Sequence, residues 1–367
     1  MSLPLSLTHS HPAVWQMPVL EAFRKNVLAR AYADINTGWE DTLIPLGLVL
    51  AGRAFDDAAM VNWAAEWSAY HLAVEPQSPS TEAFRNQNSG DPLRGLYLTP
   101  YCGEWGSAMV FAELHDHQAD DQLLKAVRLL ADHIIDGSIR VGDGIIAHGH
   151  WSQIPWVDTL YYSAAPLARA FRLTGEARYA REAVDQCLLH ARYLRDPQSG
   201  CFFHEVHIDT GERTNWLWSR GNGWIIMALA DTLRHCPADM QGWSEVLDIY
   251  RSMVVGLLRL QHPCGLWRIV PENEEAHLET SGAIMIATGL TVGIAEGYIN
   301  RTTAANVLRT WYEVLTWITP DGRLMGCQTP AGAGGWETHK RSVIGERTYG
   351  TGSLLRLAAE MHKGGLI

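Results

Sequence analysis

The chain has 367 residues, a net charge of −11, 15 tryptophans and a hydrophobic content of 47%. An acidic chain of this kind is poorly suited to bind nucleic acid or an anionic membrane surface, and it contains no apolar run of about 18 residues to span a membrane. The length exceeds that of a usual single core, but Pro, Gly and Ser form no linker. We therefore expect one domain over residues 1–367.

The cysteines and the first residues bear on the cellular compartment. Residues 1–15 lack the basic segment and the continuous apolar segment of a signal peptide. The six cysteines show no paired spacing, which fits free thiols in a reducing compartment and predicts a cytoplasmic protein. Walker, G-x-S-x-G and dinucleotide-binding motifs are missing, and we expect no cofactor.

Amphipathic helical stretches alternate along the chain with more apolar ones that begin with polar or small residues. The expected amphipathic stretches are Ala13–Ile35, Asp56–Ala73, Asp120–Asp136, Glu176–Leu194, Met240–Gln261 and Arg301–Trp317. The apolar stretches that follow them, one after each, are Gly38–Leu50, Gly103–Leu114, Trp156–Phe171, Ser219–Leu233, Glu279–Leu290 and Glu346–Leu357. Six buried helices alternating with six half-exposed ones predict an all-α fold, an (α/α)6 barrel.

Short extended segments are expected between these helices. Gly144, Gly200, Gly265 and Gly322 each follow an amphipathic helix and begin a short apolar segment, which predicts glycine turns leading into β-ribbons. The polar stretch Glu75–Asp91 has the length of a long functional loop within the barrel.

The starts of the inner helices meet at one end of such a barrel. They carry Asp41, Glu104, Asp158, Arg220, Glu279 and Glu346. Asp158 lies among aromatic residues at Trp156–Tyr162, where a carboxylate either caps the helix or acts as an acid/base with a pKa raised by burial. Glu104 has the matching position one hairpin earlier, and two carboxylates across a pocket would suit glycoside hydrolysis.

Arg220 lies in a segment of three tryptophans and two glycines, residues 216–224. A guanidinium at a helix start is suited to bind a carboxylate or a phosphate. The alternative is an internal ion pair with one of the barrel-end carboxylates. Aromatic faces in a concave site also stack on sugars, which makes tryptophans beside the loops candidates for carbohydrate binding: Trp39, Trp105, Trp151, Trp156, Trp216, Trp218 and Trp336.

Histidines offer two conceivable metal pairs, His148 with His150 and His204 with His207. No third ligand follows at a telling spacing, and a hydrogen-bonding role is favoured over a metal site.

Three stretches resemble the unsaturated rhamnogalacturonyl hydrolases of glycoside hydrolase family 105, which are related to the unsaturated glucuronyl hydrolases of family 88. They are Trp156–Tyr162, Trp218–Leu229 and Gly265–Ile286. The resemblance implies an (α/α)6 barrel without metal or cofactor. Its partner would be an oligosaccharide that carries a 4,5-unsaturated uronic acid at its non-reducing end, as polysaccharide lyases produce.

The resemblance also implies residue roles. Asp158 would protonate C4 and help water to add at C5, and the resulting hemiketal would open and expel the sugar at C1. His204, Arg220 and Trp224 fall at positions that bind the unsaturated sugar, and Trp218 would line the pocket. The family commonly has a second Asp in the preceding hairpin, where this chain has Glu104.

Two further functions remain open at this stage. The first is that of another (α/α)6 enzyme, either a conventional glycosidase or a sugar epimerase. An epimerase would need two histidines as acid and base, and His148, His150 or His204 could supply them. The other is a non-catalytic sugar-binding barrel in which Asp158 only caps its helix. The sequence leaves both the type of uronide and the identity of the aglycone undecided.

Overall fold

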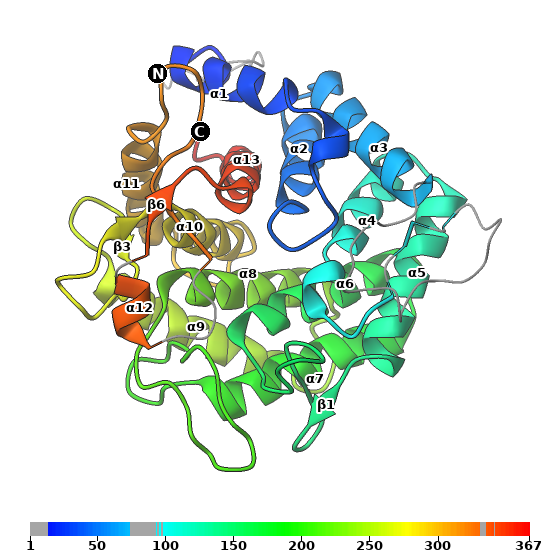
Figure 1. The fold of residues 1–367 in the computed structure, drawn as a ribbon, viewed down its shortest axis with the longest axis vertical. Coiled ribbons are helices and arrows are strands. Elements are labelled where there is room, and N and C mark those ends of the chain that lie inside the picture. The colour runs from blue at the N-terminus through cyan, green and yellow to red at the C-terminus, as the bar shows by residue number, and fades with distance from the viewer. Residues whose placement is uncertain (1–13, 74–92, 94, 97, 331–334, 341) are drawn as a thin grey trace, which may run out of the picture.

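The computed structural model describes residues 14–73, 93, 95–96, 98–330, 335–340 and 342–367, and the expected loop Glu75–Asp91 lies outside them. Its helices form two concentric rings (Figure 1). The inner ring consists of α2 (Leu43–Ala54), α4 (Ser107–His117), α6 (Val157–Thr174), α8 (Ser219–His235), α10 (Thr280–Ala295) and α13 (Thr348–Lys363). The outer ring consists of α1 (Pro18–Leu28), α3 (Ala58–Ala73), α5 (Asp121–Asp136), α7 (Ala177–Leu194), α9 (Trp243–Leu260) and α11 (Ala304–Leu315). The predicted (α/α)6 barrel is confirmed.

Burial explains why the two rings differ in sequence. In α8 every residue from Ser219 to Leu233 is buried, because the helix contacts its inner neighbours as well as the outer ring. In α5 burial is confined to one stripe, formed by Ala126, Val127, Leu130, Ala131 and Ile134. An outer helix therefore needs an apolar stripe, whereas an inner helix is apolar on nearly all sides.

The barrel closes where its last helix packs against its first inner helix, α13 against α2 (Figure 1). A side chain at Gly352 would place its Cβ 2.1 Å from the backbone of Leu43, and one at Gly47 would place it 2.3 Å from the Gly352 carbonyl oxygen. Only glycine permits this approach. The small residues at the start of α13 thus serve tight helix packing.

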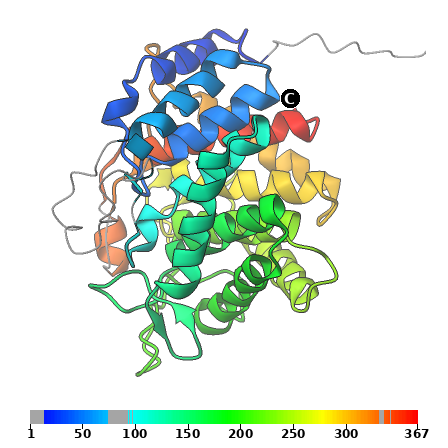
Figure 2. The ribbon, with the colours of Figure 1, turned by 90° about the vertical axis from the view of Figure 1, so that its right-hand side faces the viewer.

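Short ribbons connect outer helices to the following inner helices at one end of the barrel. Each is an antiparallel pair: β1 (Arg140–Val141) with β2 (Ile145–Ile146), β3 (Trp267–Arg268) with β4 (Leu278–Glu279), and β5 (Cys327–Gln328) with β6 (Ile344–Gly345). The four predicted turn glycines all have positive φ, between 76° and 109°. The short helix α12 (Trp336–Lys340) lies at this same end, opposite the C-terminus of α13 (Figure 2).

Several predicted boundaries are wrong. The helix expected over Ala13–Ile35 is two pieces, α1 and a 3₁₀ turn at Tyr32–Asp34, because the backbone becomes extended at Ala31. The starts expected at Gly38 and Gly103 are too early, since α2 begins at Leu43 and α4 at Ser107. Glu104 belongs to a separate 3₁₀ turn, Cys102–Glu104.

A buried ion network joins four inner helices toward the end opposite the ribbons. Arg169 of α6 donates to Glu113 of α4 and to Asp231 of α8, at 2.9 Å in each case. Arg356 of α13 donates to the other oxygen of Asp231 at 2.5 Å. Despite burial, the arginine charges hold the pKa values of Glu113 and Asp231 well below the usual range.

Candidate active site

A pocket of about 180 Å³ opens at the ribbon end of the barrel. Six of the residues predicted for the site line it: Trp39, Trp156, Asp158, His204, Trp218 and Arg220. Among the described lining residues, Asp158 and Arg220 are the two with charged side chains. The pocket therefore combines one acid and one cation with aromatic walls.

Asp158 is the second residue of α6 and is buried. Its Oδ2 atom has no hydrogen-bond partner among the described residues. Burial raises the pKa of Asp158 to about 6, although the charge of Arg220 and the indole N–H of Trp224 act in the opposite direction. This pKa lies about one unit below neutral pH, so at pH 7 about a tenth of the groups remain protonated and can act as an acid.

The other helix-start carboxylates have structural partners. Glu279 caps α10 by accepting from the backbone N–H groups of Ser281 and Gly282, whereas α6 has no side-chain cap. Asp41 accepts from the backbone N–H of Asn36, and Glu346 forms an ion pair with Arg30. Asp158 differs from these carboxylates in having an unpaired oxygen that faces a cavity.

Arg220 is the second residue of α8 and is 1% exposed. Its guanidinium lies over the rings of Trp218 and Tyr349, at 4.6 and 4.8 Å from the ring centroids. It forms no ion pair with any described carboxylate, which removes the internal pair considered from the sequence. A buried cation without a counter-ion is costly, and a ligand carboxylate would offset that cost.

His204 is positioned by its backbone. Its carbonyl accepts from Val157 N–H at 3.0 Å and its N–H donates to Thr214 Oγ1 at 2.9 Å. The ring Nε2 lies 4.0 Å from Asp158 Oδ2, and neither ring nitrogen has a hydrogen-bond partner among the described residues. Burial holds the pKa of His204 well below its usual value, so the ring is neutral and can both donate and accept.

The predicted tryptophans occupy different levels of the pocket. Trp39 stacks on Tyr349 at 5.4 Å, Trp156 stacks on His148 at 4.0 Å, and both line the cavity. Trp224 is fully buried against Tyr161 and is not among the lining residues. It lies behind the pocket wall, and its indole N–H has no hydrogen-bond partner among the described residues.

Glu104 is not among the described residues that line the pocket with Asp158. Its carboxylate accepts from the Thr37 hydroxyl at 3.3 Å, beside the loop that carries Trp39. Burial raises the pKa of Glu104, and the Thr37 hydrogen bond partly counteracts it.

Two lining residues, Tyr101 and Tyr162, were not predicted from the sequence. Trp151, one of the tryptophans predicted as candidates for carbohydrate binding, also lines the pocket, as does His148, which the sequence offered only for the alternative functions. Tyr162 carried a usable signal, because it follows Asp158 by four residues on the same helix face. Its hydroxyl donates to the Trp39 carbonyl at 2.7 Å, which fixes that loop over the pocket. Tyr101 and Trp151 come from irregular segments without a repeating pattern.

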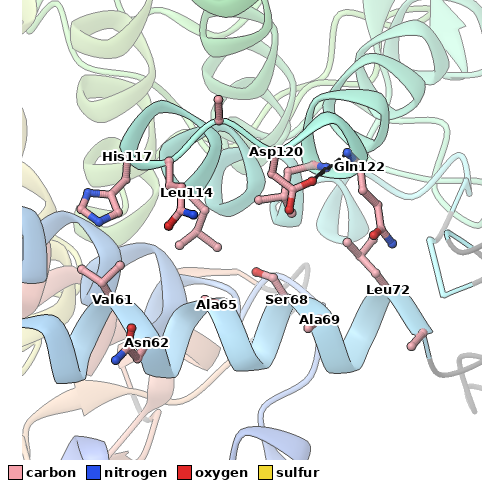
Figure 3. Close-up of a pocket in the computed structure, with 14 residues that line it drawn as sticks. Val61, Asn62, Ala65, Ser68, Ala69, Leu72, Leu114, His117, Asp120 and Gln122 are labelled. Atoms are coloured by element: carbon pink, nitrogen blue, oxygen red, sulfur yellow. Dashed lines mark hydrogen bonds between the residues drawn. The ribbon is translucent and has the colours of Figure 1, made fainter.

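A larger cavity, about 680 Å³, lies outside the barrel between α3 and the turn from α4 to α5 (Figure 3). Its one carboxylate, Asp120, accepts from the backbone N–H groups of Gln122 and Leu123 as the cap of α5. No buried unpaired acid or cation faces this cavity among the described residues, and we do not assign it to catalysis.

The described residues contain no group of three or more His, Cys, Asp or Glu side chains arranged to hold a metal ion. None of the helices that they form is long and apolar enough to cross a membrane.

The two helical rings and the aromatic pocket at the ends of the inner helices define an (α/α)6-barrel protein with a site suited to sugars. The sequence profile of glycosyl hydrolase family 88 matches residues 16–364, and the chain belongs to that family.

Curated relatives agree with this assignment. The chain is 26% identical over 214 residues to the unsaturated 3S-rhamnoglycuronyl hydrolase of Alteromonas sp. (strain LOR), covering 56% of this chain and 50% of that protein. It is 24% identical over 228 residues to the unsaturated rhamnogalacturonyl hydrolase YesR of Bacillus subtilis (strain 168), covering 60% of this chain and 63% of that protein. The match thus spans less than two thirds of either relative.

A similar solved structure is that of a possible member of the GH105 family from Salmonella enterica subsp. enterica serovar Paratyphi A. It superimposes with a TM-score of 0.83 at 18% sequence identity, and the alignment covers 99% of both chains. This likeness supports the fold of the whole barrel.

Proposed function

We propose that this protein is an unsaturated uronyl hydrolase. It removes a 4,5-unsaturated uronic acid from the non-reducing end of oligosaccharides that a polysaccharide lyase has released. The observation that carries the proposal is that one pocket holds a buried acid, Asp158, and a buried arginine, Arg220, that forms no ion pair with any carboxylate in the described part of the chain. The names of the curated relatives support the substrate class.

The number of carboxylates in the pocket supports this reaction over conventional glycoside hydrolysis. Conventional glycosidases use two carboxyl groups that flank the scissile bond. The described lining of the pocket holds one, Asp158. Hydration of a C4=C5 double bond needs one group that first gives a proton and then takes one. An epimerase is disfavoured because burial lowers the pKa of His148 to about 3 and that of His204 well below its usual value, so neither histidine is charged at neutral pH.

In the proposed reaction the uronate carboxylate binds the Arg220 guanidinium, and the sugar ring lies against the aromatic walls. The Asp158 carboxyl group gives its proton to C4, which leaves a cation shared by C5 and the ring oxygen. The Asp158 carboxylate then takes a proton from water while the water oxygen bonds to C5. The resulting hemiketal opens at the C5–O bond, and the aglycone leaves C1 as an alcohol. One water is consumed and no oxidant is needed.

The remaining predicted residues have supporting roles in this proposal. His204 hydrogen-bonds the sugar or the attacking water from its position 4.0 Å from Asp158. Trp39, Trp156 and Trp218 form the aromatic walls, and Trp224 supports Asp158 from behind. We propose that Glu104, which is not among the described lining residues, supports the Trp39 loop through Thr37.

The proposal is tested by the ultraviolet absorbance of the conjugated double bond. Purified protein should remove this absorbance from lyase-generated unsaturated disaccharides and release a free saturated sugar. Unsaturated galacturonides and unsaturated glucuronides are both to be assayed, because the sequence leaves the uronide undecided. Stable absorbance with every disaccharide of both types would contradict the proposed function.

The pH dependence should show loss of activity in base. Only protonated Asp158 can protonate C4, and its pKa is about 6 in the free protein. The value of kcat/KM should therefore fall about tenfold per pH unit above pH 6. The charge of Arg220 lowers the pKa of Asp158. A bound carboxylate that neutralises this charge should raise the pKa of Asp158, and kcat should therefore begin to fall at a higher pH than kcat/KM does. Initial rates across pH 4–9 test both expectations, and activity that rises through pH 6 would contradict the acid role.

We further propose that the aglycone sugar stacks on Trp151. This side chain is 55% exposed although it lines the pocket, and its ring lies 4.4 Å from that of Tyr101. An exposed and anchored aromatic face at a pocket mouth suits the apolar face of a pyranose ring.

Trp151→Ala should raise KM severalfold for unsaturated disaccharides, because the stacking surface for the second sugar is lost. The methyl glycoside of the same unsaturated uronic acid serves as the control substrate, since it has no second ring. Its KM should not change. An equal rise in KM for both substrates would show that Trp151 acts on the uronide and not on the aglycone.

We also propose one catalytic domain and a cytoplasmic location. The closure of α13 on α2 and the family match over residues 16–364 support a single unit. All six cysteines lie in described residues as free thiols, and five of them are buried, which suits a reducing compartment.

A further inference from the structure

Gln328, on strand β5, lies at the centre of the contacts that hold Arg220. It is fully buried. Its backbone carbonyl accepts from Arg220 Nη1 at 2.9 Å and from the Tyr349 hydroxyl. Its side-chain Oε1 accepts from the Trp218 indole N–H at 2.7 Å and faces Arg220 Nη1 at 3.4 Å.

The side-chain amide can take only one orientation in this environment. Oε1 faces two donors, Trp218 and Arg220, whereas Nε2 faces Ser342 Oγ at 3.0 Å and His339 Nδ1 at 3.2 Å. A flipped amide would direct its N–H groups at the indole and the guanidinium, which can only donate. Gln328 thus connects strand β5 and helix α12 to the two side chains that form the cation side of the pocket.

The amide provides what a carboxylate in the same place could not. It accepts hydrogen bonds from Arg220 and from Trp218 without adding negative charge. A glutamate at this position would pair with Arg220 inside the protein, and charge-assisted pairs in buried surroundings are strong. The neutral acceptor orients the guanidinium and leaves its charge for an anionic ligand.

We propose that Gln328 is a positioning residue that sets the specificity for a carboxylate-bearing terminal sugar. It acts through Arg220 and Trp218 and does not touch the reacting atoms. This inference rests on the proposed function, because it assigns the ligand of Arg220 to the uronate carboxylate of the substrate.

The test compares three variants in steady-state assays on an unsaturated uronyl disaccharide. Gln328→Glu adds a competing carboxylate and should raise KM at least about tenfold, with a smaller change in kcat. Gln328→Met keeps the side-chain length without charge and should raise KM less. Gln186→Glu is the matched control. Gln186 is also fully buried, and its side-chain amide forms hydrogen bonds with the backbone of Gly144 and Ile146 in the β1–β2 ribbon. This control should leave KM within about twofold of the wild type, whatever its stability.

A second substrate distinguishes an effect on carboxylate binding by Arg220 from a general disturbance of the pocket. The methyl ester of the unsaturated disaccharide has no carboxylate to bind Arg220. The difference in KM between wild type and Gln328→Glu should shrink to about twofold or less with the ester. An equal loss on the acid and on its ester, or a larger effect from Gln328→Met than from Gln328→Glu, would overturn the inference. Failure of the wild type to consume any unsaturated uronide would instead overturn the proposed function, and the inference with it.

Discussion

Asp158→Asn should lower kcat at least about a thousandfold while KM stays within a few fold. Asparagine keeps the size and polarity of the side chain but can neither give a proton to C4 nor take one from water. General acid–base catalysis contributes roughly 10²–10⁴ in rate, and here one group is proposed to act in both steps. Loss of the double-bond absorbance measures the effect. A variant that retains a tenth of the wild-type rate would exclude Asp158 as the acid/base.

The same variant should also be more stable at neutral pH. Because the folded-state pKa of Asp158 is raised from 3.8 to about 6, the folded protein binds more protons than the unfolded chain between these values. The group therefore costs stability that grows as the pH rises through this window, up to about 3 kcal/mol at pH 7. Removing the charge should raise the melting temperature at pH 7 but not below pH 4. The control Asp120→Asn replaces a helix cap by an equally good one and should change neither activity nor stability.

Glu104→Gln should have a smaller effect than Asp158→Asn, because Glu104 contacts Thr37 and is not among the described lining residues of the pocket. If both variants lose activity to the same extent, Glu104 takes part in the chemistry directly.

Arg220→Ala should raise KM about tenfold to hundredfold, since a hydrogen bond to a charged group contributes roughly 1.5–3 kcal/mol. Arg220 is held by neutral acceptors and by two aromatic rings, so its charge is available to bind the carboxylate of the substrate. Initial rates over a range of disaccharide concentrations measure the change. Arg220→Lys keeps the charge but loses the planar fork and should lie between the wild type and Arg220→Ala.

Arg213 provides the matched control for this prediction. It also lies over an aromatic ring, 4.7 Å from that of Phe203, but it is exposed and is not among the pocket-lining residues. Arg213→Ala should leave KM unchanged. If Arg220→Ala lowers the melting temperature without changing KM, the role of Arg220 is structural and not substrate binding.

The repeating part of the molecule could be predicted from the sequence because its physical signal is periodic. The buried stripe of α7, with Tyr179, Ala183 and Cys187, follows directly from the helical period. Asp158 and Arg220 stood out because each lies among aromatic residues at the start of an apolar helix, in a stretch that resembles a known family.

The parts that the sequence could not predict depend on contacts between distant segments. Gln328 is more than 100 residues from Arg220, and nothing in its neighbourhood on the chain marks it. Glu104 lies in a 3₁₀ turn whose other two residues, Cys102 and Gly103, line the pocket while Glu104 does not, and helical periodicity does not reveal such a difference. Trp151 was only one of many tryptophans until the structure showed it exposed at the mouth.

The ion network across the inner helices has a consequence for how a saccharide moves. Arg356 donates to the Tyr161 hydroxyl at 2.9 Å, and the Tyr161 ring packs against Trp224 behind the pocket. Buried charges and aromatic rings thus form a floor beneath the pocket, and a chain cannot thread through the barrel. If the protein acts as proposed, a saccharide enters end first and its products leave by the same opening. The rate of degradation should then follow the number of chain ends and not the length of the chains.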